Sequence, residues 1–190
     1  TARSRGLGDV YKRQVLDTDI ASLRASQRDK FRADHIGYIF QQFNLLPYLN
    51  VIENVLIPCQ FSKIRRDRVT PNASTTSLEE QATTLLERLR LPKALHDKPV
   101  SELSIGQQQR VAAARALIGQ PELVIADEPT SALDHDNRKA FIELLMEQAN
   151  LANATLVFVS HDPTLESLFD RTLNLPEINQ SHNPGAASRV

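Results

Sequence analysis

Two short segments of the sequence carry residue types that could bind a phosphate and a metal ion. They are Leu103–Arg110 (LSIGQQQR) and, after one helix length of sequence, Leu123–Thr130 (LVIADEPT). A helix that begins near Gly106 would present unpaired backbone N–H groups and the positive end of its dipole to an anion. A buried strand that ends in Asp127 and Glu128 would place two carboxylates at the carboxyl end of a sheet, where α/β proteins bind ligands. Carboxylates at that place suit a metal ion and an attacking water.

The first segment has two interpretations, and both use the same atoms. Ser104 and Gln107 have the S-x-x-Q spacing of a capping box, which needs no ligand. Alternatively, Ser104 Oγ and the N–H groups around Gly106 form a phosphate site, because a glycine lets an anion approach the backbone closely. Under the second interpretation Ser104, Gly106 and Gln107 are candidate nucleotide-binding residues.

The second segment could be a helix-capping acid followed by an ordinary exposed glutamate. The run Pro129–Asp134 that follows it, and the phosphate-binding candidate that precedes it, favour a functional interpretation. Asp127 would hold Mg²⁺ through water, and Glu128 would polarise or deprotonate the attacking water.

Two further polar residues come directly after expected strands. His161 follows a strand expected at 155–160 and could donate a hydrogen bond to the outermost phosphate. Gln41 follows a strand expected at 35–40, and its amide oxygen could reach the metal ion or the water. On chemistry alone Gln42 is an equally good candidate.

The elements that would position these residues alternate between strand and helix. We expect a mainly helical stretch at about 51–116, strands at 35–40, 123–126 and 155–159, a helix at about 138–150 and a weaker strand near Leu173. Within the helical stretch, Ser77 and Glu80 have the spacing of a second capping box. Strand, helix and strand at this spacing predict an α/β fold whose parallel sheet has right-handed crossovers.

Composition excludes several other classes of protein. The chain has 190 residues, of which 41% are hydrophobic, and a net charge of -1, so charge gives no argument for a nucleic-acid partner. No apolar run is long enough to insert directly into a membrane. The lone cysteine, Cys59, is expected to be a packed residue in a protein of the reducing cytoplasm. Solvated positions are expected for the basic run Lys63–Arg68 and for His35, His96, His135 and His182.

The order of these motifs resembles the ATP-binding subunits of ABC transporters from Val15 to about Asn179. Phe40–Pro47 (FQQFNLLP) matches the Q-loop, which selects Gln41 over Gln42, and Leu103–Gln107 (LSIGQ) matches the signature motif. Leu123–Glu128 (LVIADE) matches Walker B with its glutamate. Ser131–Asp134 (SALD) matches the D-loop, and His161 matches the switch histidine.

The resemblance implies a P-loop NTPase-like parallel-sheet core with an inserted α-helical subdomain. It also implies ATP and Mg²⁺ as ligands, with Glu128, His161 and Gln41 catalytic and with Asp127 and Gln41 at the metal. Asp134 joins Ser104, Gly106 and Gln107 as a nucleotide-binding residue. The implied partners are a second ATPase subunit and a membrane permease, which would hold the protein on the cytoplasmic face of the plasma (inner) membrane.

Two segments suggest a subgroup within this family. Val15–Ile20 (VLDTDI) and Asn44–Val55 (NLLPYLNVIENV) resemble subunits that work with lipoprotein-release and macrolide-export permeases.

Two features depart from the family's pattern. Ile105 stands where a glycine is usual, and no G-x-x-x-x-G-K-[ST] loop occurs in the chain. We expect residues 1–14 to be a non-native, adapter-derived tail, residues 15–178 to be a partial ATPase domain without its N-terminal strands and Walker A loop, and residues 179–190 to be a disordered tail. Such a fragment is expected to be inactive alone. The alternative is a non-catalytic partner subunit that supplies only the signature motif to another ATPase.

Overall fold

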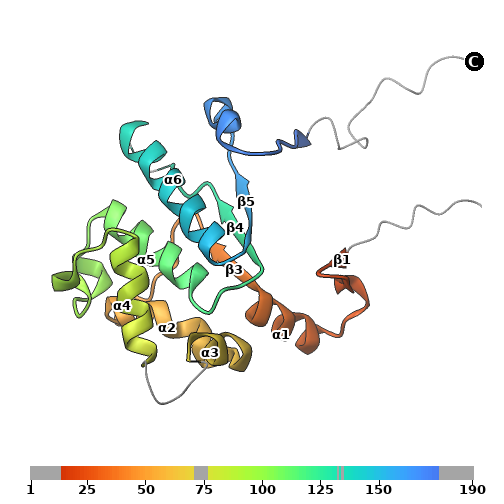
Figure 1. Cartoon of the computed structure of the whole chain (residues 1–190), viewed down its shortest axis with the longest axis horizontal. Coiled ribbons are helices and arrows are strands. Elements are labelled where there is room, and N and C mark those ends of the chain that lie inside the picture. The colour runs from red at the N-terminus through yellow and green to blue at the C-terminus, as the bar shows by residue number, and fades with distance from the viewer. Residues whose placement is uncertain (1–13, 71–76, 132, 134, 176–190) are drawn as a thin grey trace, which may run out of the picture. The chain divides into compact units, whose positions relative to one another are not determined.

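The chain divides into two compact units, Thr1–Val159 and Ser160–Val190. The structure, a computed structural model, describes residues 14–70, 77–131, 133 and 135–175. Of the tails expected at 1–14 and 179–190, all residues but Gln14 therefore lie outside the described residues, as does Asp134. The strands and α-helices of the described chain belong to the first unit (Figure 1).

A three-stranded parallel sheet forms the centre of the first unit. Its strands are β3 (Ile36–Ile39), β4 (Leu123–Asp127) and β5 (Thr155–Val159), in that spatial order. Ile39 pairs with Ala126, which in turn pairs with Phe158. The parallel sheet predicted from the sequence is confirmed, because β3 pairs with β4, and β4 with β5, in parallel. Helix α6 (His135–Leu151) supplies the crossover between β4 and β5.

Helices cover one face of this sheet. The face that carries Ile39, Val124 and Ala126 is buried, and helices α5 (Ile105–Leu117) and α6 pack against it. On the opposite face Val157 and Val159 are 44% and 40% exposed. This alternation follows from the two-residue period of a strand.

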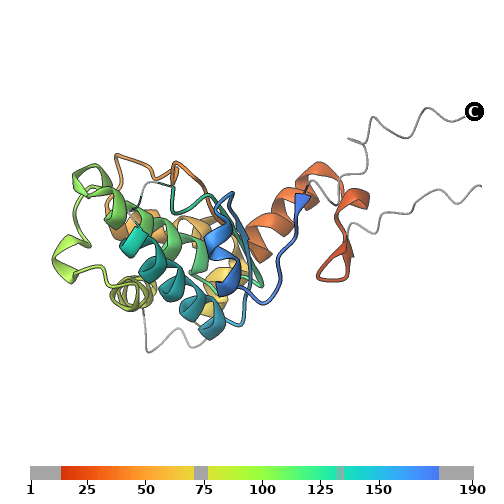
Figure 2. The ribbon, with the colours of Figure 1, turned by 90° about the horizontal axis from the view of Figure 1, so that it is seen from above.

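The remaining elements of the first unit precede α5 in the sequence. A small antiparallel hairpin of β1 (Gln14–Val15) and β2 (Thr18–Asp19) leads through η1 (Ile20–Ser22) into α1 (Ala25–His35). After β3 come α2 (Val51–Phe61), α3 (Lys63–Val69), α4 (Leu78–Arg88) and the short helices η2 (Lys93–Leu95) and η3 (Val100–Glu102). Figures 1 and 2 both show α1 projecting from β3 on the side away from α4.

Helix α5 lies in the middle of the hydrophobic core. It packs on α2 and α4 as well as on β3 and α6, and the side chains of Val111 and Ala112–Ala114 are buried. The predicted capping box at the start of α4 is formed, since Ser77 Oγ accepts from Glu80 N at 3.2 Å and Ser77 N donates to Glu80 Oε2 at 2.9 Å. Cys59 is buried, as expected.

Three expectations about this part of the chain are wrong. Arg65, in the basic run expected to be solvated, is only 2% exposed, because its guanidinium binds backbone carbonyls at the end of α5. His96 is 3% exposed and its Nε2 lies 3.2 Å from Leu91 O. His35 is half-buried, with Nδ1 at 3.0 Å from Glu122 Oε2.

The second unit contains the short helix η4 (Pro163–Leu168), which Asp162 caps by accepting a hydrogen bond from Thr164 N. The strand expected near Leu173 is not formed, and residues 171–174 are irregular. The described part of this unit contains no other strand, so a strand near Leu173 would have no hydrogen-bond partner within it. None of the helices in the described residues combines the length and the apolar composition needed to cross a membrane.

Candidate functional site

The start of α5 forms the capping box that one interpretation of the sequence predicted. Ser104 Oγ accepts a hydrogen bond from Gln107 N at 3.4 Å, and Gln107 Oε1 accepts one from Ser104 N at 2.9 Å. The N–H groups of Ile105 and Gly106 precede the first bonded turn and have no intrahelical acceptor. A Cβ added at Gly106 would meet only Leu133 Cδ2, at 3.8 Å, so packing among the described residues does not require a glycine here. The N–H groups around Gly106 are therefore free of helix partners and can also serve as the predicted phosphate site.

A hollow of about 460 Å³ lies beside this helix terminus. Ser104, Gly106 and Gln107 line it together with two arginines, Arg90 and Arg110, and no acidic side chain of the described chain is part of its wall. Burial, and secondarily the charge of Arg90, lowers the pKa of Arg110 from its ordinary value. The hollow thus combines cationic side chains with a helix N-terminus, which suits a phosphate group. Sequence reasoning missed both arginines.

The carboxylates lie at the end of the central strand. Asp127 is the last residue of β4 and is exposed, while Glu128 is half-buried. Glu128 adopts a φ of 45° and its N–H donates to Val159 O at 3.0 Å, so the chain turns sharply at this residue. A positive φ is uncommon for a residue other than glycine, and such conformations concentrate at functional sites.

Gln41 reaches the same edge of the sheet as these carboxylates. Ile39 pairs with Ala126, so Gln41, two residues beyond Ile39, follows its strand at the edge where Asp127 ends β4. Gln41 and Gln42 are both exposed. The structure therefore brings Gln41, Asp127 and Glu128 to one edge, as the order of the motifs led us to expect.

Helix α5 fixes both loops at this edge. Gln109, 1% exposed, donates from Nε2 to Pro129 O at 2.6 Å and so ties the helix to the turn after Glu128. Arg115 donates to the carbonyls of Phe43 and Asn44, with 2.6 Å between its NH1 and Asn44 O, and so holds the turn after β3. Sequence reasoning missed both residues, although a glutamine among Val111 and the alanines of a buried helix face is a signal that could have found Gln109.

The donor set at this edge fits Mg²⁺ held in part by a nucleotide. The described residues contain no group of three or more histidine, cysteine, aspartate or glutamate side chains that could hold a metal ion unaided. Mg²⁺ usually keeps several waters and takes only one or two protein carboxylates plus substrate phosphates. Asp127 with the amide of Gln41 meets that smaller requirement.

Comparison with known proteins decides the family. The family model described as ABC transporter matches residues 8–131. This chain is a member of the ABC transporter family. The chain is 40% identical over 163 residues to the lipoprotein-releasing system ATP-binding protein LolD of Hydrogenovibrio crunogenus, covering 86% of the chain and 66% of LolD. It is 33% identical over 180 residues to the macrolide export ATP-binding/permease protein MacB of Chromobacterium violaceum, covering 95% of the chain and 26% of MacB.

A solved structure of this family has the same fold. The dimeric post-hydrolysis state of the ATP-binding cassette MJ0796, bound to ADP and Pi, is 33% identical and superimposes with a TM-score of 0.65 over 80% of this chain and 62% of the cassette. The predicted P-loop NTPase-like α/β core is thereby confirmed. The LolD and MacB relatives also confirm the subgroup that the sequence suggested. The chain spans about two thirds of the length of that LolD and about a quarter of that MacB.

Two of the family's motif positions, Asp134 and His161, are not placed relative to Glu128. Asp134, the D-loop aspartate of an ABC transporter, lies outside the described residues. His161 belongs to the second unit, Ser160–Val190, where it is exposed and follows Ser160. The roles of both residues stay predictions.

Proposed function

We propose that this chain is the ATP-binding subunit of an ABC transporter and that ATP hydrolysis by it powers export or lipoprotein extraction through a membrane permease. The observation that carries the proposal is the position of α5, whose Gln109 and Arg115 hold the turns that follow Glu128 and Gln41. One helix thereby links a phosphate-suited hollow at its own N-terminus to the carboxylate edge of the sheet. The resemblance to LolD and MacB supports the transport role.

The hollow at the start of α5 binds nucleotide phosphates in this proposal. Ser104 and Gln107 hold the first turn of the helix in place, and the N–H groups around Gly106 meet the phosphate oxygens. Arg110 adds positive charge at the wall of the hollow. The MJ0796 cassette is dimeric with ADP and Pi, which supports a homodimer in which Asp134 contributes to the shared nucleotide site.

The carboxylate edge carries the hydrolytic chemistry. Asp127, through water, and Gln41 would hold Mg²⁺, which when bound neutralises part of the phosphate charge. The Glu128 carboxylate accepts a proton from the attacking water as the general base. His161 donates a hydrogen bond to the outermost phosphate and stabilises the charge that develops there.

Phosphate binding by these 190 residues is incomplete by itself. No G-x-x-x-x-G-K-[ST] loop is present in the sequence, so the charge-assisted contacts that such a loop makes to the β- and γ-phosphates are missing. We therefore expect the chain alone to bind ATP weakly and to be inactive. Attachment to a permease would place it on the cytoplasmic face of the inner membrane.

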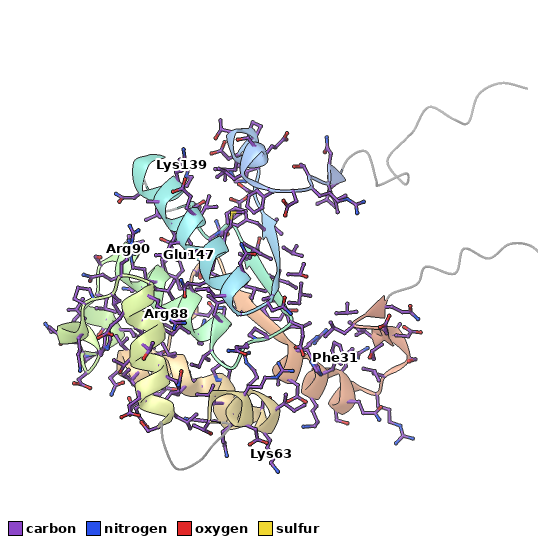
Figure 3. All side chains as sticks on the ribbon, in the orientation of Figure 1. Phe31, Lys63, Arg88, Arg90, Lys139 and Glu147 are labelled. Atoms are coloured by element: carbon purple, nitrogen blue, oxygen red, sulfur yellow. The ribbon has the colours of Figure 1, made fainter. Side chains whose placement is uncertain are left out.

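The proposal is tested by supplying the phosphate contacts that the absent loop would make. A fusion is made in which the N-terminal part of Hydrogenovibrio crunogenus LolD, up to the residue that aligns with Val15, is joined to Val15 of this chain and supplies a G-x-x-x-x-G-K-[ST] loop. We expect Mg²⁺-dependent ATP hydrolysis from the fusion, measured by phosphate release. Glu128→Gln in the fusion should keep ATP binding and lower turnover about 100-fold or more, since the general base is lost. Glu147→Gln, an exposed glutamate on α6, is the matched control and should leave turnover unchanged (Figure 3).

Vigorous turnover by the Glu128→Gln fusion would rule out the catalytic role of Glu128. In the alternative function, the chain is a non-catalytic partner that supplies only its signature motif, at the start of α5, to another ATPase. The complete capping box and the hollow at Ser104 favour this alternative. It predicts a fusion that hydrolyses no ATP itself but raises turnover when it is mixed with intact LolD. The retained Glu128 and His161 argue against it, since a non-catalytic partner needs neither.

A further inference from the structure

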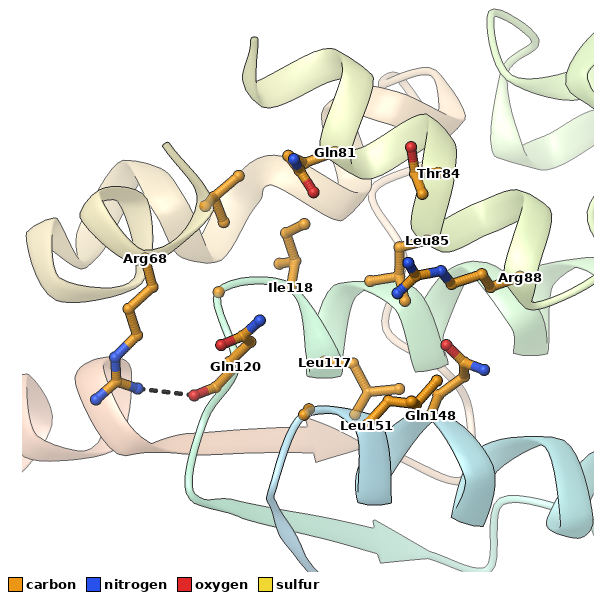
Figure 4. Close-up of a pocket in the computed structure, with 13 residues that line it drawn as sticks. Arg68, Gln81, Thr84, Leu85, Arg88, Leu117, Ile118, Gln120, Gln148 and Leu151 are labelled. Atoms are coloured by element: carbon orange, nitrogen blue, oxygen red, sulfur yellow. Dashed lines mark hydrogen bonds between the residues drawn. The ribbon is translucent and has the colours of Figure 1, made fainter. Parts of the chain in front are cut away.

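A second cavity lies at the opposite end of α5 from the nucleotide-suited hollow. It has a volume of about 90 Å³ and is bounded by α3, α4, the end of α5 and the end of α6 (Figure 4). The 13 residues of α5 separate the two ends of the helix by roughly 20 Å. The cavity is therefore distinct from the hollow at Ser104.

The lining of this cavity combines apolar and positively charged side chains. Leu85, Leu117 and Leu151 supply the apolar wall, and Arg68 and Arg88 supply the guanidinium groups. No acidic side chain is among the described residues that line it. A ligand that fits this wall has an anionic end and an apolar end.

The two arginines differ in what they already bind. Arg68 donates to Glu122 Oε1 at 2.5 Å and to Gln120 O at 2.7 Å, the bond drawn dashed in Figure 4, so its charge is neutralised. Arg88, the last residue of α4, has no ion pair or hydrogen-bond partner for its side chain within the described chain. The cavity thus holds one uncompensated guanidinium, which matches a monoanion.

Gln148 brings a hydrogen-bonding group to the wall of this cavity. Its side chain is 4% exposed and lines the cavity, where Figure 4 shows its carboxamide directed from α6 toward α4. Among the described residues this carboxamide has no hydrogen-bond partner. The fully enclosed, unpartnered side-chain atoms of the described residues do not include this amide nitrogen or oxygen, so both stay accessible from the cavity, where a ligand can meet them.

We propose that this cavity binds a small organic carboxylate with a short apolar tail. The carboxylate accepts hydrogen bonds from the Arg88 guanidinium and from Gln148 Nε2, and the tail lies against Leu85, Leu117 and Leu151. The apolar wall and the single uncompensated cation favour this ligand over inorganic phosphate. The inference does not depend on the proposed nucleotide chemistry.

The test uses nuclear magnetic resonance of the full chain with ¹³C-labelled leucine methyl groups, titrated with sodium hexanoate. We expect saturable shifts of the methyl signals of Leu85, Leu117 and Leu151. Hexanamide, which has the same tail without the charge, should bind about tenfold more weakly or worse, because the charge-assisted hydrogen bonds are lost. No saturation up to about 10 mM hexanoate would overturn the proposal.

Two variants and one control test where the carboxylate of hexanoate binds. Arg88→Gln should weaken hexanoate binding about tenfold, whereas Lys63→Gln, which removes an exposed charge on α3 outside the cavity wall, should leave it unchanged (Figure 3). Gln148→Glu should weaken it further, because a carboxylate would then face a carboxylate. Arg88 is exposed, so its variant keeps the test decisive even if Gln148→Glu does not fold. Unchanged affinity in Arg88→Gln, or inorganic phosphate that displaces hexanoate at equal concentration, would contradict the proposed ligand.

Discussion

Arg65 lies within the charged run Lys63–Arg68, yet its side chain is buried against the end of α5. Its Nε donates to Ile118 O at 2.8 Å and its NH2 donates to Ala116 O at 2.6 Å. Burial lowers the pKa of Arg65 to about 10, which still leaves the guanidinium charged at neutral pH. The residue caps the carbonyls that the helix leaves unpaired at its C-terminus, and its positive charge suits the negative end of the helix dipole.

Replacing Arg65 should therefore cost far more stability than replacing its exposed neighbour. In Arg65→Met the apolar stem remains, but two buried carbonyls lose their donors, and we expect the free energy of unfolding to fall by about 2–4 kcal/mol. Lys63→Met, at the exposed start of the same helix, should change it by less than about 0.5 kcal/mol. Urea unfolding followed by circular dichroism at pH 7 measures both. Equal effects of the two substitutions would show that Ala116 and Ile118 find other donors.

At the scale of elements, β3 and α5 approach each other closely at Gly37. A Cβ on this residue would stand 2.2 Å from Ala116 O, a backbone atom that cannot move without shifting the helix. The close approach lets Arg115, one residue earlier on α5, reach the carbonyls of Phe43 and Asn44. Contact between this strand and this helix thus sets the turn that follows Gln41.

Gly37→Ala should disrupt this contact. We expect the free energy of unfolding to fall by about 3 kcal/mol, since the added methyl group must displace backbone rather than a flexible side chain. Gly106→Ala is the matched control, because its Cβ would meet only Leu133 Cδ2 at 3.8 Å. Thermal and urea unfolding of both variants measures the difference. A Gly37→Ala variant as stable as Gly106→Ala would mean that α5 and β3 can separate without loss.

At the scale of the whole first unit, Glu122 joins three segments that are distant in sequence. It precedes β4, accepts a hydrogen bond from Arg68 of α3 at 2.5 Å, and lies 3.0 Å from the Nδ1 of His35 at the end of α1. Burial raises the pKa of Glu122, but the hydrogen bonds from Arg68 and His35 outweigh it and lower that pKa from 4.5 to about 2.

Acid should therefore remove the stability that Glu122 contributes. Because the pKa in the folded state is below that in the unfolded state, the contribution is complete above about pH 4.5 and is lost as pH falls toward 2. Glu122→Gln should lower the free energy of unfolding at pH 7 by about 1 kcal/mol, a small effect because solvent screens the partly exposed pair. Urea unfolding at several pH values should show the two proteins converging between pH 4.5 and 2. A constant difference across that range would contradict the ionic role of Glu122.

The sequence by itself determined the local features of this protein. The capping boxes at Ser77 and Ser104, the strand at 155–159 and the order in which Gln41, Asp127 and Glu128 follow their strands could all be predicted. These features depend on hydrogen bonds within one turn of helix or on the period of one strand, and neighbouring residues carry that information.

Only the tertiary structure decided which polar side chains are buried and what they bind. Arg65, Gln109 and Arg115 each donate to carbonyls of distant segments, and the carboxamide of Gln148 faces a cavity between helices. A periodic pattern shows which face of a helix turns inward, but it does not show which carbonyl lies opposite a given side chain. The expected strand near Leu173 fails for the same physical reason, because a strand is stable only where another segment supplies its hydrogen-bond partners.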